Sequence, residues 1–176
     1  MNKVIYLIGG KAGSGKDTMA DYMCKNYGCK RLAYADALKD YTSEKYNIDR
    51  NLFDTQDGKM KVIKVNDSEL TIRQLLINVS LEKKLTNENL WIDIVIQQIL
   101  DSDKEFIVIS DFRYPAEYFE LTKKFNYVST IKIVRDNVKL INDHSETALD
   151  TFDFDCIIDN NSDVNSLYST LDSYMI

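Results

Sequence analysis

The stretch GGKAGSGKDT, residues 9–18, decides the fold of this chain. It contains the spacing Gly-x-x-x-x-Gly-Lys, in which Gly10, Gly15 and Lys16 follow a short apolar run and precede a segment with helical periodicity. Glycines let the backbone curl so that successive N–H groups point at phosphate oxygens, and the following helix adds the partial positive charge of its N-terminus. A glycine-rich turn without a ligand is the alternative, but spacing and context together favour a phosphate-binding loop. The predicted loop consists of Gly10, Lys11, Ala12, Gly13, Ser14, Gly15, Lys16, Asp17 and Thr18.

Asp17 is the unusual residue of this loop. The common pattern has serine or threonine directly after the lysine, where the hydroxyl helps to hold Mg²⁺. Two unit charges about 4 Å apart interact by about 4 kcal/mol at an effective dielectric constant of about 20, so a carboxylate aimed at phosphate is strongly disfavoured. Asp17 either turns away within the first helical turn, where the helix dipole favours aspartate and Thr18 is left to contact phosphate, or joins the water shell of Mg²⁺.

The composition excludes several classes of protein. The 176 residues, 44% of them hydrophobic, suit one compact domain with its own core, and a net charge of −6 has the wrong sign for binding a nucleic acid polymer. No apolar run approaches the roughly 20 residues of a membrane span, and the first run, VIYLI, is too short for a signal peptide. We therefore expect a cytoplasmic protein that binds no membrane. Its three cysteines lack metal-ligand spacing and are expected to be buried hydrophobes.

Predicted strands and helices alternate along the chain. This alternation implies right-handed crossovers and a parallel sheet with helices on both faces, which is a three-layer α/β sandwich. Two helices have predicted N-caps, at Asp36 and Thr71. The pattern is weak over residues 47–67, where Asp57-Gly58 predicts a turn and the run KMKVIKV an additional β segment. The five strands are predicted at residues 3–8, 30–35, 105–110, 128–134 and 155–159, and the helices at residues 16–28, 37–46, 72–85, 90–100, 116–125 and 164–175.

Three charged residues follow the third predicted strand, at the carboxyl edge where parallel sheets bind ligands. Asp111 ends a buried apolar strand like a Walker B acid, and it could hold Mg²⁺ through water or orient an acceptor. Arg113 could bind an acceptor phosphate or the phosphoryl group in transfer. Glu117 lies four residues further on and could pair with Arg113. The alternative for all three is an exposed loop with an ordinary ion pair.

The chain has only five arginines, so their positions are informative. Arg73 lies in the first turn of a predicted helix, where it opposes the helix dipole, and its guanidinium suits a bidentate grip on a monophosphate. Arg135 follows the fourth strand and could close over ATP from a lid, or it could be a solvated charge at the strand end. We interpret His144, the only histidine, as lid structure or a nucleotide contact, because a phosphate oxygen that is already ionised needs no general base. Trp91, the only tryptophan, is expected in the core on composition alone.

Several segments resemble the deoxynucleoside monophosphate kinases of phages and large DNA viruses. GKDT, with no hydroxyl directly after the lysine, is similar to their phosphate loop, and SDFRYPAE to their Asp-x-Arg-x-x-x-Glu motif. YADALKD, TIRQLL, the later LW and DHSE resemble further segments of that family. The resemblance extends from Lys3 to about Asn161, and phosphomevalonate kinase is a more distant look-alike. One departure is Ser80-Leu81, which stands where the family tends to carry a Gly-Thr pair, so the base preference stays open.

The resemblance implies a P-loop kinase fold as a single domain over residues 1–176, with its five parallel strands in the order 2-3-1-4-5. It implies an acceptor-binding helical insert over roughly residues 36–100 and a short lid over roughly residues 135–150. ATP and Mg²⁺ are the implied cofactors and small nucleotides the partners. A homodimer is suggested by the family alone, as is the host cytoplasm for a viral chain.

The same resemblance assigns roles to individual residues. The predicted catalytic residues are Lys16, Asp111, Arg113 and Arg135. Mg²⁺ is expected at Asp17 and Asp111, through water. The acceptor nucleotide is expected to contact Lys39, Arg73, Trp91, Asp111, Arg113 and Glu117.

The sequence therefore predicts transfer of the γ-phosphate of ATP to a deoxynucleoside 5′-monophosphate, giving the diphosphate. One alternative is a kinase for another small phosphate ester, such as phosphomevalonate. A second alternative is a nucleotide-binding switch that hydrolyses ATP slowly and signals through a partner.

Overall fold

The computed structural model describes residues 2–138 and 144–175, and the chain divides into two compact units. The first unit contains the chain up to residue 33 and again from residue 96, and the second contains residues 34–95. Among the described residues, no helix combines the length and the apolar character that crossing a membrane requires.

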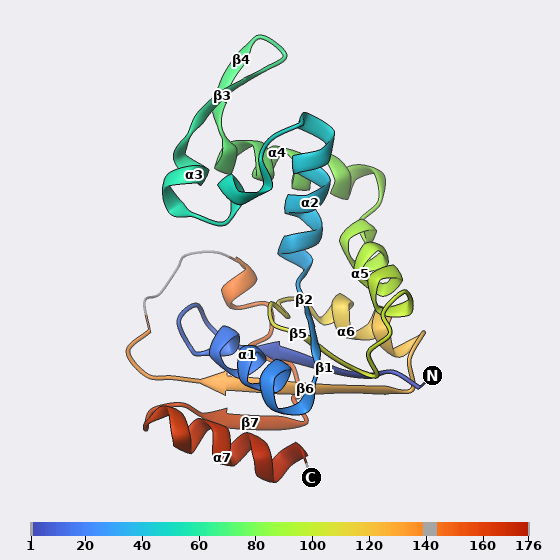
Figure 1. Ribbon diagram of the computed structural model, residues 1–176, viewed down its shortest axis with the longest axis vertical. Coiled ribbons are helices and arrows are strands. Elements are labelled where there is room, and N and C mark those ends of the chain that lie inside the picture. The colour runs from blue at the N-terminus through green and yellow to red at the C-terminus, as the bar shows by residue number, and fades with distance from the viewer. Residues whose placement is uncertain (1, 139–143, 176) are drawn as a thin grey trace. The chain divides into compact units, whose positions relative to one another are not determined.

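The first unit is built on a five-stranded parallel sheet (Figure 1). Its strands stand in the order β2-β5-β1-β6-β7, and every neighbouring pair is parallel. This label order differs from the predicted 2-3-1-4-5 only because the numbers β3 and β4 belong to a separate hairpin. The five strands are β1 (Val4–Gly9), β2 (Lys30–Leu32), β5 (Phe106–Ile109), β6 (Tyr127–Val134) and β7 (Cys156–Asp159).

Helices cover both faces of this sheet (Figure 1). Helices α1 (Lys16–Tyr27) and α7 (Val164–Met175) share one hydrophobic core, in which Met19 and Leu167 pack with Ile8 of the central strand. Side chains alternate along a strand, so Ile5 and Leu7 face the opposite way, where α6 (Pro115–Thr122) runs between β5 and β6. Helix α1 connects β1 to β2 toward one edge of the sheet, and α6 connects β5 to β6 toward the other edge. Because such crossovers are right-handed, the two helices lie on opposite faces, as the predicted α/β sandwich requires.

The second unit is mostly helical and contains a two-stranded antiparallel sheet. Thr71 caps α4 as predicted, because its hydroxyl accepts the Gln74 N–H while the Gln74 side chain accepts the Thr71 N–H. The last helix of this unit, α5, continues past residue 95 into the first unit. The elements are α2 (Tyr34–Tyr46), the 3-10 turn η1 (Arg50–Phe53), α3 (Gln56–Met60), β3 (Val62–Val65), β4 (Ser68–Thr71), α4 (Ile72–Thr86) and α5 (Leu90–Leu100).

Two local predictions in this unit are wrong. Asp36 is not an N-cap, because α2 already begins at Tyr34 and Asp36 lies in its first turn. The predicted turn at Asp57-Gly58 is part of helix α3, since the Thr55 hydroxyl accepts the Gly58 N–H and caps that helix. In both places a local signal for a turn or cap lies inside a helix, because α2 begins two residues before Asp36 and α3 begins one residue before Asp57.

Candidate phosphate-binding site

The predicted phosphate loop, called the phosphate loop below, follows the carboxyl end of the central strand β1 and leads directly into α1. Gly13 and Gly15 have φ angles of 80° and 109°, which side chains disfavour, and α1 begins at Lys16. The loop therefore lies at the N-terminal end of a helix, where backbone amides carry partial positive charge and favour anions.

Asn160, directly after β7, holds this loop from the side. Its Nδ2 donates a 2.7 Å hydrogen bond to the Ser14 carbonyl oxygen, and a Cβ atom at Gly15 would lie only 2.5 Å from the same nitrogen. Glycine is thus favoured at position 15 both by the φ angle and by the space that Asn160 occupies. The Ser14 hydroxyl is buried and has no hydrogen-bond partner among the residues that the structure describes.

Lys16 is buried and folded onto its own loop. Its Nζ donates to the carbonyl oxygens of Gly10 and Lys11, at 2.6 and 2.8 Å. Burial, and then the nearby charge of Arg113, lower the pKa of Lys16, while carboxylates that include Asp111 act in the opposite direction. The lysine therefore sits among charges of both signs at the phosphate loop.

Glu146, at the end of the 3-10 turn η2 (His144–Glu146), bridges two predicted site residues. Its Oε2 accepts the Ala12 N–H of the phosphate loop at 2.9 Å, and its Oε1 accepts from Arg113 Nη1 at 2.8 Å. Arg113 Nη1 also donates to Ser145 Oγ at 3.0 Å. The structure therefore brings Arg113 to the phosphate loop through a carboxylate that the sequence analysis did not assign.

Glu117 has a different contact from the pairing considered in the sequence analysis. Its Oε2 accepts the backbone N–H groups of Arg113 and Tyr114, at 2.8 and 3.2 Å, and so closes the turn that begins α6. Burial raises the pKa of Glu117 to about 8, with Asp111 contributing in the same direction and the two N–H groups opposing it. Glu117 thereby fixes the backbone that carries Arg113.

Asp17 turns away from the loop and lies at the protein surface. Its carboxylate pairs with the Arg31 guanidinium, which also binds Asp21 one helical turn further on, at 2.9 Å. Arg31 is anchored in turn by a 3.0 Å hydrogen bond from its Nε to Ser110 Oγ, at the end of β5. This pairing was not among the alternatives for Asp17, and it gives the carboxylate a partner other than phosphate.

Arg135 lies beside the phosphate loop and lines a cavity of about 580 Å³. The turn after β6 is tied to the turn after β7, because the Asp136 N–H donates to Asn161 Oδ1 at 2.7 Å. Residues 139–143 of the predicted lid lie outside the described residues, and so does the side chain of His144. The cavity is lined by Ala12, Gly13, Arg135, Asp136, Asn137, Val138 and Asn161.

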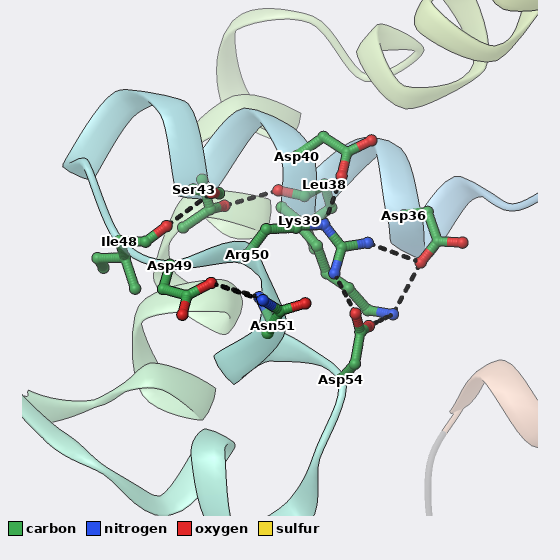
Figure 2. A network of polar contacts seen from close by, with 11 residues as sticks. Asp36, Leu38, Lys39, Asp40, Ser43, Ile48, Asp49, Arg50, Asn51 and Asp54 are labelled. Carbon is green, nitrogen blue, oxygen red and sulfur yellow. Dashed lines mark hydrogen bonds and ion pairs between the residues drawn. The ribbon is translucent and has the colours of Figure 1, made fainter.

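The predicted acceptor residue Lys39 belongs to a network of charges in the second unit (Figure 2). Its Nζ binds Asp36 at 2.8 Å and Asp54 at 3.0 Å, and Arg50 contacts the same two carboxylates and Asp40. Burial alone would lower the pKa of Lys39, but its two carboxylate partners raise it above the ordinary value. Lys39 therefore stays charged and is held in one position on α2.

Arg73 lies at the start of α4 and is exposed. Its Nη2 donates to Gln56 Oε1 at 2.9 Å, which ties α4 to α3. On α3, Lys59 forms no ion pair with a carboxylate among the described residues. Burial, followed by the charges of Lys39 and Arg73, lowers the pKa of Lys59. Three cations thus lie near one another within the second unit.

Trp91 is buried and packs edge to face against Tyr41, with ring centroids 5.6 Å apart. Its Nε1 has no hydrogen-bond partner within the described part of the chain. Core packing, the expectation from composition, accounts for the ring, while the indole N–H is a buried donor whose partner the described residues do not supply.

Sequence reasoning missed four residues of these sites. Asn160 and Glu146 contact the phosphate loop from 146 and 134 residues away, and Arg31 pairs with Asp17 from 14 residues away. Lys59 lies in the segment where the sequence pattern was weakest. Only DHSE, the segment that contains Glu146, carried a signal, and that signal was a resemblance without a role. Their positions follow from the tertiary fold.

Comparison with known proteins supports the fold. The sequence matches no protein-family model and no curated protein. Its structure is similar to TT1252 from Thermus thermophilus (TM-score 0.54, 14% identity, 99% of this chain and 97% of that one). It is also similar to an unliganded sugar kinase from Janibacter, with a TM-score of 0.54 and 14% identity over 99% of this chain and 95% of that one. A third similar structure is dephospho-CoA kinase from Campylobacter jejuni, with a TM-score of 0.50 and 17% identity over 99% of this chain and 98% of that one. At these identities the likeness concerns the fold alone, and it confirms the predicted P-loop kinase fold.

Proposed function

We propose that this chain is an ATP-dependent kinase that transfers the γ-phosphate of ATP to a deoxynucleoside 5′-monophosphate. The observation that carries the proposal is the convergence of Lys16, Arg113 and the Ala12 amide at the N-terminus of α1. Phosphoryl transfer is catalysed mainly by positioning and by neutralising charge, and these groups supply both. Two of the similar structures are themselves named as kinases, which supports the reaction class.

Phosphoryl transfer requires few protein groups beyond Lys16, Arg113 and the Ala12 amide. An ionised phosphate oxygen of the acceptor attacks the γ-phosphorus of ATP, a new P–O bond forms, and the bond to the bridging oxygen breaks to release ADP. The attacking oxygen carries no proton at neutral pH, so no general base is needed. Lys16 would leave the loop carbonyls to bind phosphate oxygens, and Arg113 would neutralise the phosphoryl group in transfer.

The donor set fits Mg²⁺ bound largely by phosphate and water. Among the described residues, no group of three or more His, Cys, Asp or Glu side chains could hold a metal without help. Mg²⁺ usually keeps several waters and takes one or two carboxylates together with substrate phosphates. Asp111, whose charge acts on Lys16, is the carboxylate that we assign to it, with Thr18 supplying a hydroxyl. Mg²⁺ would neutralise charge on the phosphates, and Asp17 would join its water shell only after leaving Arg31.

The nucleotide base of ATP suits the cavity lined by Arg135, next to the phosphate loop. On the acceptor side, Lys59 and Arg73 form no ion pair among the described residues and supply positive charge that suits a phosphate monoester, while Lys39 beside them is already paired with Asp36 and Asp54. The buried Trp91, with its unpaired N–H, is the candidate for a contact with the acceptor nucleotide. Glu117 supports Arg113 in this proposal and is not itself required to touch the acceptor.

A coupled assay of ADP release tests the proposal. The purified chain is offered ATP, Mg²⁺ and each of a panel of deoxynucleoside and ribonucleoside monophosphates, with phosphomevalonate as a further acceptor. We expect turnover with at least one deoxynucleotide, and a loss of at least about a hundredfold in Lys16→Ala and Arg113→Ala. Lys25→Ala, at the far end of α1, is the matched control and should retain full activity.

Two outcomes would replace the proposal. Turnover with phosphomevalonate and with no nucleotide would identify a kinase for a different phosphate ester. Slow ATP hydrolysis that no monophosphate accelerates, and that Arg113→Ala leaves unchanged, would indicate a nucleotide-binding switch.

A further inference from the structure

The phosphate site already holds an anion that belongs to the chain itself. The Glu146 carboxylate accepts the Ala12 N–H with one oxygen and Arg113 Nη1 with the other, at 2.9 and 2.8 Å. Only 7% of the Glu146 side chain is exposed to solvent, against 35% for Arg113. The Glu146 carboxylate is therefore largely enclosed and is hydrogen-bonded through both oxygens.

The two groups that Glu146 occupies are of the kind that bind phosphate. A backbone N–H in a loop at a helix N-terminus and a guanidinium both form strong, charge-assisted hydrogen bonds to carboxylates and to phosphates alike. Burial by itself would raise the pKa of Glu146, but the Ala12 N–H, Arg113 and Lys16 more than offset this and leave it below the ordinary value. The carboxylate is therefore ionised at neutral pH and competes as a full negative charge.

Lys16 also has hydrogen-bond partners within the protein, and these are atoms other than those of Glu146. Its ammonium group is satisfied by two carbonyl oxygens of the loop, at 2.6 and 2.8 Å, and its side chain is folded back into the protein. A phosphate oxygen cannot donate to these carbonyls, so the lysine must turn before it can bind one. The donors on both sides of the loop thus have internal partners.

We propose that Glu146 is an internal competitor for the phosphate site, which must leave the Ala12 amide and Arg113 before a polyphosphate can bind them. The inference rests on the loop binding phosphate, as the proposed function requires. Two anions cannot share these donors, because their mutual repulsion adds to the loss of the hydrogen bonds. The segment that carries Glu146 and the phosphate loop therefore exist in at least two arrangements, one closed by the carboxylate and one open to phosphate.

Calorimetric titration with inorganic pyrophosphate tests this inference without any turnover. Glu146→Gln keeps the size of the side chain but removes its charge, and its amide can accept from only one of the two donors. We expect this variant to bind pyrophosphate at least about tenfold more tightly than the original chain. Glu120→Gln, which removes an equal charge from an ion pair on α6 with Lys123, is the matched control and should change the affinity less than twofold.

Each result decides the matter. Unchanged or weaker binding in Glu146→Gln would overturn the inference and would mean that the carboxylate holds Arg113 in place for phosphate. Absence of pyrophosphate binding in both proteins would overturn it as well. If Glu146→Gln does not fold, Glu146→Asp serves instead, since its shorter side chain cannot span both donors and should still tighten binding several-fold.

The proposed function can fail separately. If Glu146→Gln binds pyrophosphate more tightly but the protein transfers phosphate to no nucleotide, Glu146 is a competitor for the phosphate site and the kinase assignment is wrong. If the protein phosphorylates a deoxynucleotide but the original chain and Glu146→Gln bind pyrophosphate equally well, the kinase assignment holds and Glu146 is not a competitor.

Discussion

Replacing Gly15 by alanine should destabilise the protein through two separate effects. The φ angle of 109° lies in a region that side chains rarely adopt, and holding alanine there costs about 1–3 kcal/mol. The new Cβ would lie 2.5 Å from Asn160 Nδ2, so Asn160 must move and give up its buried hydrogen bond to the Ser14 carbonyl. An unsatisfied buried group of this kind costs about 1–3 kcal/mol, which brings the expected loss to about 2–6 kcal/mol.

Urea unfolding measures this loss, and Gly28→Ala is the matched control. Gly28 also has a positive φ angle, of 66°, but a Cβ there would meet no atom within 4 Å. Its replacement should therefore cost only the backbone strain, about 1–2 kcal/mol. Equal losses in the two variants would refute the argument that Asn160 braces the loop. We also expect Gly15→Ala to weaken pyrophosphate binding at least about tenfold, and Gly28→Ala to leave it unchanged, because only the first distorts the phosphate loop.

Three further variants test single contacts. Thr71→Ala should lower the unfolding free energy by about 1 kcal/mol, because it removes the hydroxyl that caps α4, whereas Thr86→Ala at the other end of that helix should cost less; urea unfolding compares them. Burial holds the pKa of Glu117 near 8, above its value in the unfolded chain, so the stability it contributes is complete below the unfolded pKa and is lost as the pH rises through about 8. Glu117→Gln should remove this pH dependence. If the free energy of unfolding changed equally in the two proteins between pH 5 and pH 9, the pKa shift would be contradicted. Asp17→Asn should lower stability by less than about 1 kcal/mol, since its pair with Arg31 is largely exposed, and an altered Mg²⁺ requirement for turnover would place Asp17 in the metal's water shell.

Much of the fold could be predicted from the sequence because its signals are local. Short apolar runs that alternate with helical periodicity predict a parallel α/β sheet, and the spacing of Gly10, Gly15 and Lys16 predicts the loop at the end of the first strand. Thr71, predicted as an N-cap, does cap α4, because its hydroxyl accepts the Gln74 N–H. Where local signals were mixed, as at Asp36 and around Gly58, the prediction failed, because aspartate suits the first turn of a helix as well as a cap or a turn, and Asp36 and Asp57 both lie in first turns.

The sequence by itself determined which residue types could bind phosphate, since the spacing of glycines and a lysine next to a strand and a helix is a property of the chain. Only the tertiary structure decided what those residues contact. Arg31 captures Asp17, Asn160 fills the space beside Gly15, and Glu146 reaches the Ala12 amide across 134 positions of sequence. Such contacts depend on which loops the parallel sheet gathers at the carboxyl ends of its strands, and no local pattern encodes that meeting.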